Sequence, residues 1–265
     1  MFSKFYALLV IFWGLTTMNL QAQITDTVEV KVNPLYNESW IRSNKIASIT
    51  ISHGNSENIF KYDSLGRLIY KRIDFLIQDS LFYKQNKLIK IKSDNYDNFE
   101  DEEYVYDSID RLVKIKETSI SKKNNRTRLL TAEIKYNFKG QVLEIHHFDH
   151  SITSFEYLKD TVVATNRANF FGIKATTIHK TIYQDGHLKT VLNKLQDEEI
   201  KVAYQISYDH LKRVTVIDGM WQRQEFVYDE NGLIHIVKFQ NKSGFNRLFG
   251  DESEYKVSYT FYNPN

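Results

Sequence analysis

Residues 62–68 read YDSLGRL, and related stretches recur along most of the chain. The full set is YDSLGRL at Tyr62, YKQNKL at Tyr83, YDSIDRL at Tyr106, YNFKGQV at Tyr136, YLKDTV at Tyr157, YQDGHL at Tyr183, YDHLKRV at Tyr208 and YDENGLI at Tyr228. Successive tyrosines lie 20–30 residues apart. A repeat of this period indicates one small structural unit that is used many times.

The spacing within YDSLGRL is that of a tight β-hairpin. Asp63 suits the first position of a type I turn, and Gly66 suits the left-handed position that follows and forms a bulge. A three-residue loop then places Tyr62 opposite Leu68. In the shorter repeats two residues make the turn, as Asp185-Gly186 does in a type I′ hairpin. The same rule gives seven further pairs: Tyr83 with Leu88, Tyr106 with Leu112, Tyr136 with Val142, Tyr157 with Val162, Tyr183 with Leu188, Tyr208 with Val214 and Tyr228 with Ile234.

Three repeats depart from the ideal turn. Asp110 and Lys212 stand where glycine is expected, and aspartate tolerates the left-handed region better than lysine does. A two-residue turn at Asn231-Gly232 would set Tyr228 opposite His235 instead of Ile234. We expect the three-residue loop there.

The arms of the hairpins alternate apolar and polar residues, as strands do. The chain has 17 Tyr and 17 Phe but only two prolines, which favours strands. Eight hairpins, an opening strand near 46–51 and a closing strand near 257–262 predict about 16–18 strands. We therefore expect an all-β fold: an antiparallel meander of about eight hairpins forming one strongly twisted or rolled sheet, with a two-layer sandwich as the alternative.

The repeats resemble the YD repeats of Rhs-type proteins, in which Y-D-x-x-G-R-L recurs at about this period. YDSLGRL matches fully, YDSIDRL, YDHLKRV and YDENGLI match in part, and the resemblance covers most of residues 46–262. In large members such repeats build a sheet that spirals into a hollow shell around a toxin segment, and they are linked to carbohydrate binding and cell contact. The resemblance implies structural roles for the motif positions and carries no catalytic residue. We expect this chain to be too short for a closed shell.

The N-terminal residues have the layout of a secretory signal. Lys4 precedes an apolar run from Phe5 to Leu15, and Ala22 ends a short polar region. An uncleaved N-terminal anchor is the alternative. We expect a signal peptide over 1–22, an N-terminal extension over 23–45 and the hairpin-repeat domain over 46–265.

Composition restricts the compartment and the partners. The chain has no cysteine, which excludes disulfides, cysteine-ligated zinc and thiol catalysis. A formal net charge of +2 gives no electrostatic reason to expect nucleic acid as a partner. Beyond the signal no apolar run is long enough to span a bilayer, so we expect no transmembrane segment in the mature chain. The predicted location is the periplasm or the exterior.

The histidine-rich stretch EIHHFDH (144–150) is the best metal candidate, with His146, His147, Asp149 and His150. In a strand His146 and His147 point to opposite faces, and His146 and His150 lie about 13 Å apart. Zinc needs its ligands around one centre. We therefore predict no metal site and read these residues as polar strand-end positions.

Two oppositely charged segments flank one predicted hairpin. Residues 94–103 (DNYDNFEDEE) are acidic, and residues 121–128 (SKKNNRTR) are basic. They are expected to emerge at the same edge of the sheet and to pair. A calcium site is the alternative, although the spacing differs from the EF-hand loop.

Two irregular insertions, NRANFFGIK (166–174) and NKSGFNRLFG (241–250), supply the candidate ligand-binding residues. One hypothesis is a pair of aromatic-lined sites where rings stack on sugars or a partner. The other, which we favour, is that these segments fold over the ends of the sheet and cover its apolar face. The residues concerned are Phe170, Phe171, Phe245 and Phe249.

No nucleophile elbow, zinc-protease motif, phosphate loop or dinucleotide fingerprint occurs in the sequence. We therefore predict no catalytic residue and no cofactor. The predicted function is that of an exported, non-enzymatic binding or structural module of the cell envelope, with a glycan or an envelope protein as partner. The alternatives are an accessory of an Rhs-like contact or toxin system, and a hydrolase without a recognisable motif.

Overall fold

The computed structural model describes residues 37–262 except 55, 75–76, 171–172, 196–198, 220–221 and 243–251. Within these residues the chain forms one short helix and eighteen strands. The elements are α3 (Glu38–Ser43), β1 (Ile46–His53), β2 (Ser56–Tyr62), β3 (Leu68–Ile73), β4 (Ile77–Lys84), β5 (Lys87–Asn95), β6 (Asn98–Tyr106), β7 (Leu112–Ser121), β8 (Thr127–Tyr136), β9 (Val142–His146), β10 (Ile152–Tyr157), β11 (Thr161–Phe170), β12 (Ile173–Gln184), β13 (His187–Leu195), β14 (Lys201–Tyr208), β15 (Val214–Gly219), β16 (Gln222–Tyr228), β17 (Ile234–Asn241) and β18 (Glu252–Phe261).

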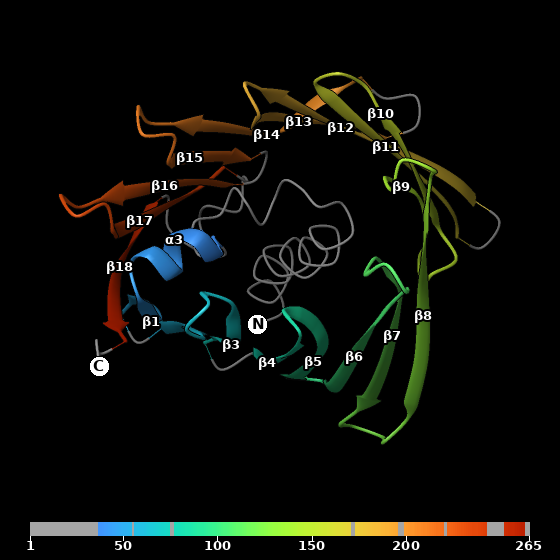
Figure 1. Ribbon diagram of the computed structural model, residues 1–265, viewed down its shortest axis with the longest axis horizontal. Helices are drawn as coiled ribbons and strands as arrows, with labels where there is room; N and C mark the ends of the chain where they lie inside the picture. Colours follow the sequence, from blue (N-terminus) through green and yellow to red (C-terminus); the bar gives the residue numbers. More distant parts are fainter. Residues whose placement is uncertain are drawn as a thin grey trace.

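The strands form a closed antiparallel β-barrel. Each strand pairs with the strands before and after it in the chain, and β18 pairs with β1. Ile49 of β1, for example, faces Tyr259 of β18 on one side and Phe60 of β2 on the other. The ring of strands is visible in Figure 1.

Closure corrects the predicted architecture. The all-β class is confirmed, but the sheet is neither an open rolled meander of hairpins nor a two-layer sandwich. An open sheet would leave unpaired N–H and C=O groups along its first and last strands, and pairing β1 with β18 satisfies both rows. The sequence analysis also did not foresee that this chain is long enough to close a barrel. The strands are only 5–12 residues long, so a chain of this length supplies enough strands for a complete ring.

The register confirms the predicted pairing of a tyrosine with an aliphatic residue in every repeat. Tyr62 faces Leu68, and Tyr228 faces Ile234, which shows the three-residue loop over residues 230–232. The remaining pairs are Tyr83–Leu88, Tyr106–Leu112, Tyr136–Val142, Tyr157–Val162, Tyr183–Leu188 and Tyr208–Val214.

The turn backbone also follows the sequence chemistry. In the three-residue loops Gly66, Asp110 and Lys212 all have positive φ, at 81°, 71° and 62°. The backbone N–H of Gly66 donates to the carbonyl of Asp63 at 2.9 Å, as in a type I turn. Asp185 and Gly186 both have positive φ, as a type I′ turn requires.

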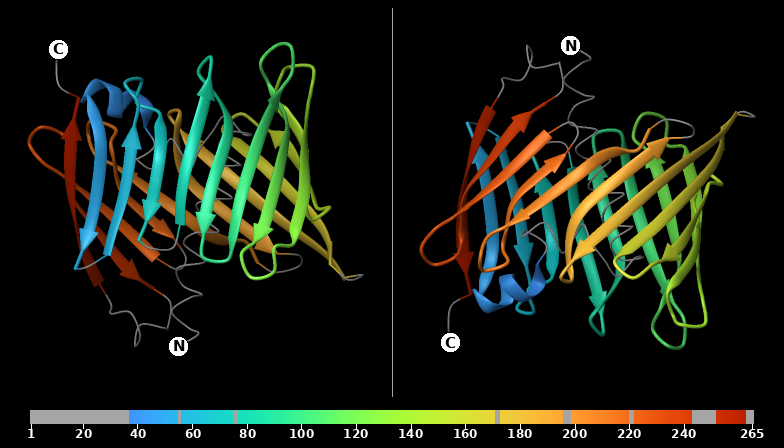
Figure 2. Two further views of the ribbon diagram at one scale, coloured as in Figure 1. Left: turned by 90° about the horizontal axis from the view of Figure 1, so that it is seen from below. Right: turned by 90° about the horizontal axis from the view of Figure 1, so that it is seen from above.

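All eight tyrosine turns lie at the same end of the barrel, because they follow the even-numbered strands of an antiparallel meander. This end, defined by the turns after β2, β4, β6, β8, β10, β12, β14 and β16, is called the tyrosine end. Figure 2 shows the strands running between it and the opposite end. Helix α3 lies inside the ring, at the tyrosine end. The side chain of Asn37 caps this helix by accepting from the N–H of Trp40 at 3.1 Å.

The buried face of the sheet is its inner face. Ile41 of α3 is fully buried and packs in the same cluster as Ile49 and Val237 from the barrel wall. A second cluster continues around the wall over β5–β9, with Ile115 and Ile145 fully buried. The apolar core is therefore a belt along the inner wall.

The outer wall over β5–β9 carries cross-strand ion pairs. Lys90 pairs with Asp101 at 2.7 Å, and Lys114 pairs with Glu133 at 3.0 Å. These side chains alternate with inward-facing residues such as Ile91. Charged outward-facing groups of this kind favour contact with water over contact with lipid. Separately, none of the helical residues described forms a helix long and apolar enough to cross a membrane.

Candidate functional site

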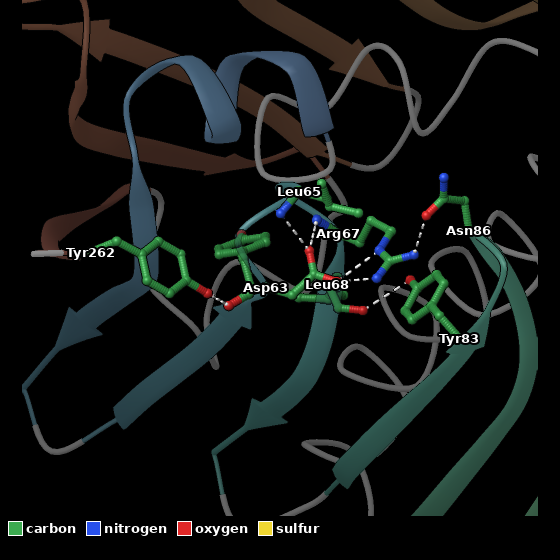
Figure 3. Close-up of polar contacts among 8 residues, drawn as sticks. Asp63, Leu65, Arg67, Leu68, Tyr83, Asn86 and Tyr262 are labelled. Atoms are coloured by element: carbon green, nitrogen blue, oxygen red, sulfur yellow. Dashed lines mark hydrogen bonds and ion pairs between the residues drawn. The ribbon is translucent and has the colours of Figure 1, made fainter. Parts of the chain in front are cut away.

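Several of the repeat tyrosines link their hairpin to the one before it. The hydroxyl of Tyr83 donates to the carbonyl of Leu68 at 2.9 Å, and Leu68 is the partner of the preceding tyrosine, Tyr62 (Figure 3). The same bond recurs from Tyr106 to Leu88 at 2.8 Å. Further bonds of this type join Tyr136 to Leu112, Tyr208 to Leu188, Tyr228 to Val214 and Tyr259 to Ile234.

The aspartate and arginine of the motif complete this linkage. One carboxylate oxygen of Asp63 accepts from the N–H groups of Leu65 and Arg67, at 2.9 and 3.0 Å, and the other accepts from the guanidinium of Arg67. The Arg67 guanidinium lies 4.5 Å from the ring centre of Tyr83, the next tyrosine along the chain. Arg111 and Arg213 lie over Tyr136 and Tyr228 in the same way. The motif residues thus hold neighbouring hairpins together. The candidate functional site lies on another part of the barrel wall.

The inner wall carries polar as well as apolar side chains. A row of inward-facing polar residues crosses β3–β8 next to the apolar belt. Strand register places its members side by side. In order around the wall the row is Lys71, Asp79, Ser93, Glu100, Ser119 and Arg128.

Lys71 and Asp79 form a buried ion pair at one end of this row. The two charged groups are 2.6 Å apart, and their side chains are only 3% and 9% exposed. They face each other on neighbouring strands. Burying two charges is costly, and the pair is maintained because each charge compensates the other.

Beside the row, Glu102 of β6 and Glu117 of β7 lie directly opposite each other on the inner wall. Like charges at such positions repel, since the Cβ atoms are about 4.5–5.5 Å apart. Desolvation by burial, followed by the charges of Glu100 and Glu102, raises the pKa of Glu117 to about 7. Burial also raises the pKa of Glu102, although the Tyr104 hydroxyl donates to it at 2.5 Å.

These carboxyl groups, Glu100, Glu102 and Glu117, are defined here as the inner carboxylate cluster. With a pKa of about 7, Glu117 holds a proton in roughly half of the molecules at neutral pH, so it both donates and accepts hydrogen bonds. Buried carboxyl groups that face each other and have raised pKa values are typical of binding and catalytic sites. Among the residues that the structure describes, no three acidic or histidine side chains are placed to hold a metal ion.

The polar residues of the histidine-rich stretch (144–150) each make their own local contacts. The ring of His146 bonds to Glu144 at 3.1 Å, and the ring of His147 bonds to Thr153 at 2.7 Å. His150 occupies the left-handed position of a turn, with φ of 64°. Asp149 accepts from the N–H of Ser151 in the same turn. They are polar residues at the end of a strand and in its turn, as expected for these positions.

The acidic and basic segments meet at the end of the barrel opposite the tyrosines. Lys122 pairs with the carboxylate of Asp94, and its N–H donates to the carbonyl of Asp97 at 2.8 Å. The predicted contact between these segments is confirmed. The sequence analysis did not foresee that the acidic residues of β6 point to both faces of the sheet. Asp101 faces outward to Lys90, whereas Glu100 and Glu102 face inward.

The four candidate ligand-binding phenylalanines remain untested. Phe171, Phe245 and Phe249 lie outside the described residues, and only the backbone of Phe170 is described, at the end of β11. Their assignment therefore stays a prediction.

No protein-family profile and no curated protein sequence matches the chain. Among solved structures, a porin-like protein from Bacteroides uniformis ATCC 8492 is similar with a TM-score of 0.37 and 12% identity, over 82% of this chain and 98% of that chain. A TcdB2-TccC3-TEV structure is similar with a TM-score of 0.30 and 12% identity, over 80% of this chain and 12% of that chain. A TcdB2-TccC3-Cdc42 structure has a TM-score of 0.24 and 9% identity, over 71% and 13% of the two chains. Because all three scores are low, neither a pore nor a toxin role is carried over from them.

Proposed function

We propose that this protein is an exported, non-enzymatic binding module of the cell envelope that takes up a glycan at its inner carboxylate cluster. The observation that carries the proposal is the placement of Glu102 directly opposite Glu117 on the inner wall. The motif residues at the tyrosine end are engaged in contacts between hairpins, whereas this pair weakens the wall that contains it. A ligand that supplies hydrogen-bond donors would relieve the repulsion.

Glycans have the complementary chemistry. Sugar hydroxyls donate to carboxylates, and they also accept from a protonated carboxyl group such as that of Glu117 near pH 7. Tyr104 borders the cluster through its bond to Glu102, while its ring is buried in the apolar belt beside it. The predicted signal peptide would deliver this site to a compartment where glycans are abundant.

The test is glycan binding by residues 23–265, first on an array of envelope glycans and then by calorimetry with the best ligand. We expect Glu102→Gln and Glu117→Gln each to weaken binding by about tenfold, since each removes a charge-assisted hydrogen bond. Glu103→Gln is the matched control, because Glu103 is adjacent in sequence but lies opposite Lys90 on the outer wall. Absence of binding to every glycan would count against the proposal.

The same experiment separates binding from hydrolysis. A carboxyl group with a pKa near 7 beside other carboxyl groups is also the arrangement of a general acid in glycoside hydrolysis. If the bound glycan releases reducing sugar, and Glu117→Gln abolishes the release, the protein is a hydrolase. If the glycan is recovered intact, the binding module is supported.

The proposed location needs its own measurement. We expect fractionated cells to contain a mature chain beginning at Gln23, in the periplasm or outside the cell. N-terminal sequencing of that chain distinguishes cleavage from an uncleaved anchor. A pull-down with the mature chain would test an envelope protein as the partner.

A further inference from the structure

The outer wall over β12 and β13 contains a hollow of about 150 Å³. It is separate from the inner carboxylate cluster, because the residues on β12 and β13 that flank it alternate with the inward-facing His179 and Val191. In Figure 1 these two strands lie across the ring from β3 and β4. The lining residues are Ile178, Lys180, Leu192, Asn193, Lys194 and Ile200.

Strand register arranges the lining as a checkerboard. Lys180 lies opposite Leu192, and Ile178 lies opposite Lys194. The two lysines therefore occupy one diagonal of the hollow, and the two aliphatic side chains occupy the other. Diagonal neighbours are about 7–8 Å apart, so both flexible ammonium groups reach a single anion held between them.

The lysines of the hollow differ from those elsewhere on the outer wall. Lys90 and Lys114 face carboxylates on neighbouring strands, but Lys180 and Lys194 face Leu192 and Ile178. Between described residues, no ion pair or hydrogen bond of the Lys180 or Lys194 side chain is found. Two lysine side chains without a carboxylate partner among the described residues thus flank an apolar floor.

A β-bulge borders the hollow on the β14 side. The register of β13 and β14 shifts between Val191 and Leu192, which leaves Ala203 as a bulged residue. Bulges bend a strand and often mark functional sites. Ile200, 48% exposed, lines the hollow just before β14, and Val202 faces Leu192 and is 53% exposed. Apolar surface that remains exposed beside these two lysines is complementary to an amphiphilic anion.

We propose that this hollow binds a small molecule with an aliphatic body and one carboxylate group. The aliphatic body contacts Ile178, Leu192 and Ile200, and the carboxylate lies between the ammonium groups of Lys180 and Lys194. A cavity of about 150 Å³ holds a six-carbon molecule such as benzene. Because the hollow is open to solvent, a longer chain extends beyond it, and short- and medium-chain fatty acids are the matching class.

The test is titration of the full mature chain with octanoate, monitored by calorimetry and by NMR shifts of the backbone amides. We expect saturable binding, with shifts centred on β12 and β13. Octan-1-ol, which has the same body without the charge, should bind at least tenfold more weakly, and octylamine should not bind. Equal affinity for octanoate and octan-1-ol, or no saturable binding of octanoate, would overturn the proposal.

Matched variants separate the site from general charge effects. Lys180→Gln and Lys194→Gln should each weaken octanoate binding by about tenfold, since each removes a charge-assisted hydrogen bond. Lys92→Gln, on the outer wall of β5, should leave it unchanged, and a similar loss in this control would overturn the proposal. Thermal unfolding verifies that all three variants fold. Glu117→Gln should not alter octanoate binding, so failure of this site and failure of the glycan proposal are distinguishable.

Discussion

At the tyrosine end, one set of contacts is repeated from hairpin to hairpin, whereas on the inner wall beyond the apolar belt the residues are irregular and like charges face each other. Tyr83, Tyr106 and Tyr136 donate to the same backbone position of the preceding hairpin. By contrast, Glu102 faces Glu117, and Lys71 is buried with Asp79 as its ion-pair partner. The comparison indicates that the repeated motif supplies stability and that the irregular wall is free to supply function.

The largest effect is expected at the buried ion pair. Lys71→Met leaves Asp79 as an uncompensated buried charge and should lower the free energy of unfolding by about 3–5 kcal/mol. Urea denaturation measures the change. The double variant Lys71→Met/Asp79→Leu should recover most of the loss, because the cost comes from the unpaired charge. A loss below about 1 kcal/mol in the single variant would show that water reaches this part of the wall.

The second prediction tests how closely helix α3 packs on the turn at Gly66. A Cβ atom added at Gly66 would lie 2.3 Å from the carbonyl oxygen of Glu38 in α3, and φ of 81° disfavours any side chain. Gly66→Ala should therefore cost about 2–4 kcal/mol. Gly140→Ala is the matched control, because φ is 77° there but no atom lies within 4 Å. Its cost should be about 1–2 kcal/mol, and equal costs would mean that α3 does not pack on this turn.

A third effect concerns one link between hairpins. Tyr136→Phe removes the hydroxyl that donates to the carbonyl of Leu112 at 2.8 Å while keeping the ring. We expect a loss of about 1 kcal/mol in unfolding free energy, measured by thermal or urea denaturation. Phe138→Ser, at a turn position that is 95% exposed, should change stability by less than about 0.5 kcal/mol. A neutral Tyr136→Phe variant would show that these bonds do not stabilise the ring.

A fourth expected effect is a pH dependence on the inner wall. Burial and neighbouring carboxylates raise the pKa of Glu117 from 4.5 to about 7, so between these values the folded chain binds more protons than the unfolded chain. Stability should therefore fall as pH rises from about 4.5 to 7 and then level off. Glu117→Gln should flatten this part of the profile relative to Glu103→Gln. An unchanged profile would mean that Glu117 is solvated like an ordinary surface carboxylate.

Turn chemistry made the tyrosine end predictable from the sequence. Asp63, Gly66 and Leu68 fix a local register, and every tyrosine pair follows from it. Closure was not predictable in this way, because the pairing of β1 with β18 joins residues about two hundred positions apart, and no local pattern encodes it. The interlocking hydroxyl bonds were missed for a similar reason, since they join successive hairpins rather than the arms of one.

The cross-strand partners in the inner carboxylate cluster cannot be found by counting residues from the turn. Extending the Tyr106–Leu112 pair without a bulge sets Glu102 opposite Lys116, which would be an attractive contact. The register shift between Val105 and Tyr106 moves the partner by one residue and places Glu117 there instead. A single bulge thus converts an expected ion pair into a repulsive pair, and it also determines which face each residue occupies.

The hydroxyl of Tyr262 donates to the carbonyl of Tyr62, so the last residue described is tied to the first hairpin. A linear array of repeats frays from its two ends, since each terminal unit has only one neighbour. In this barrel every hairpin has two neighbours, and loss of any one would open two unpaired strand edges at once. The ring should therefore lose its structure in a single cooperative step rather than unit by unit.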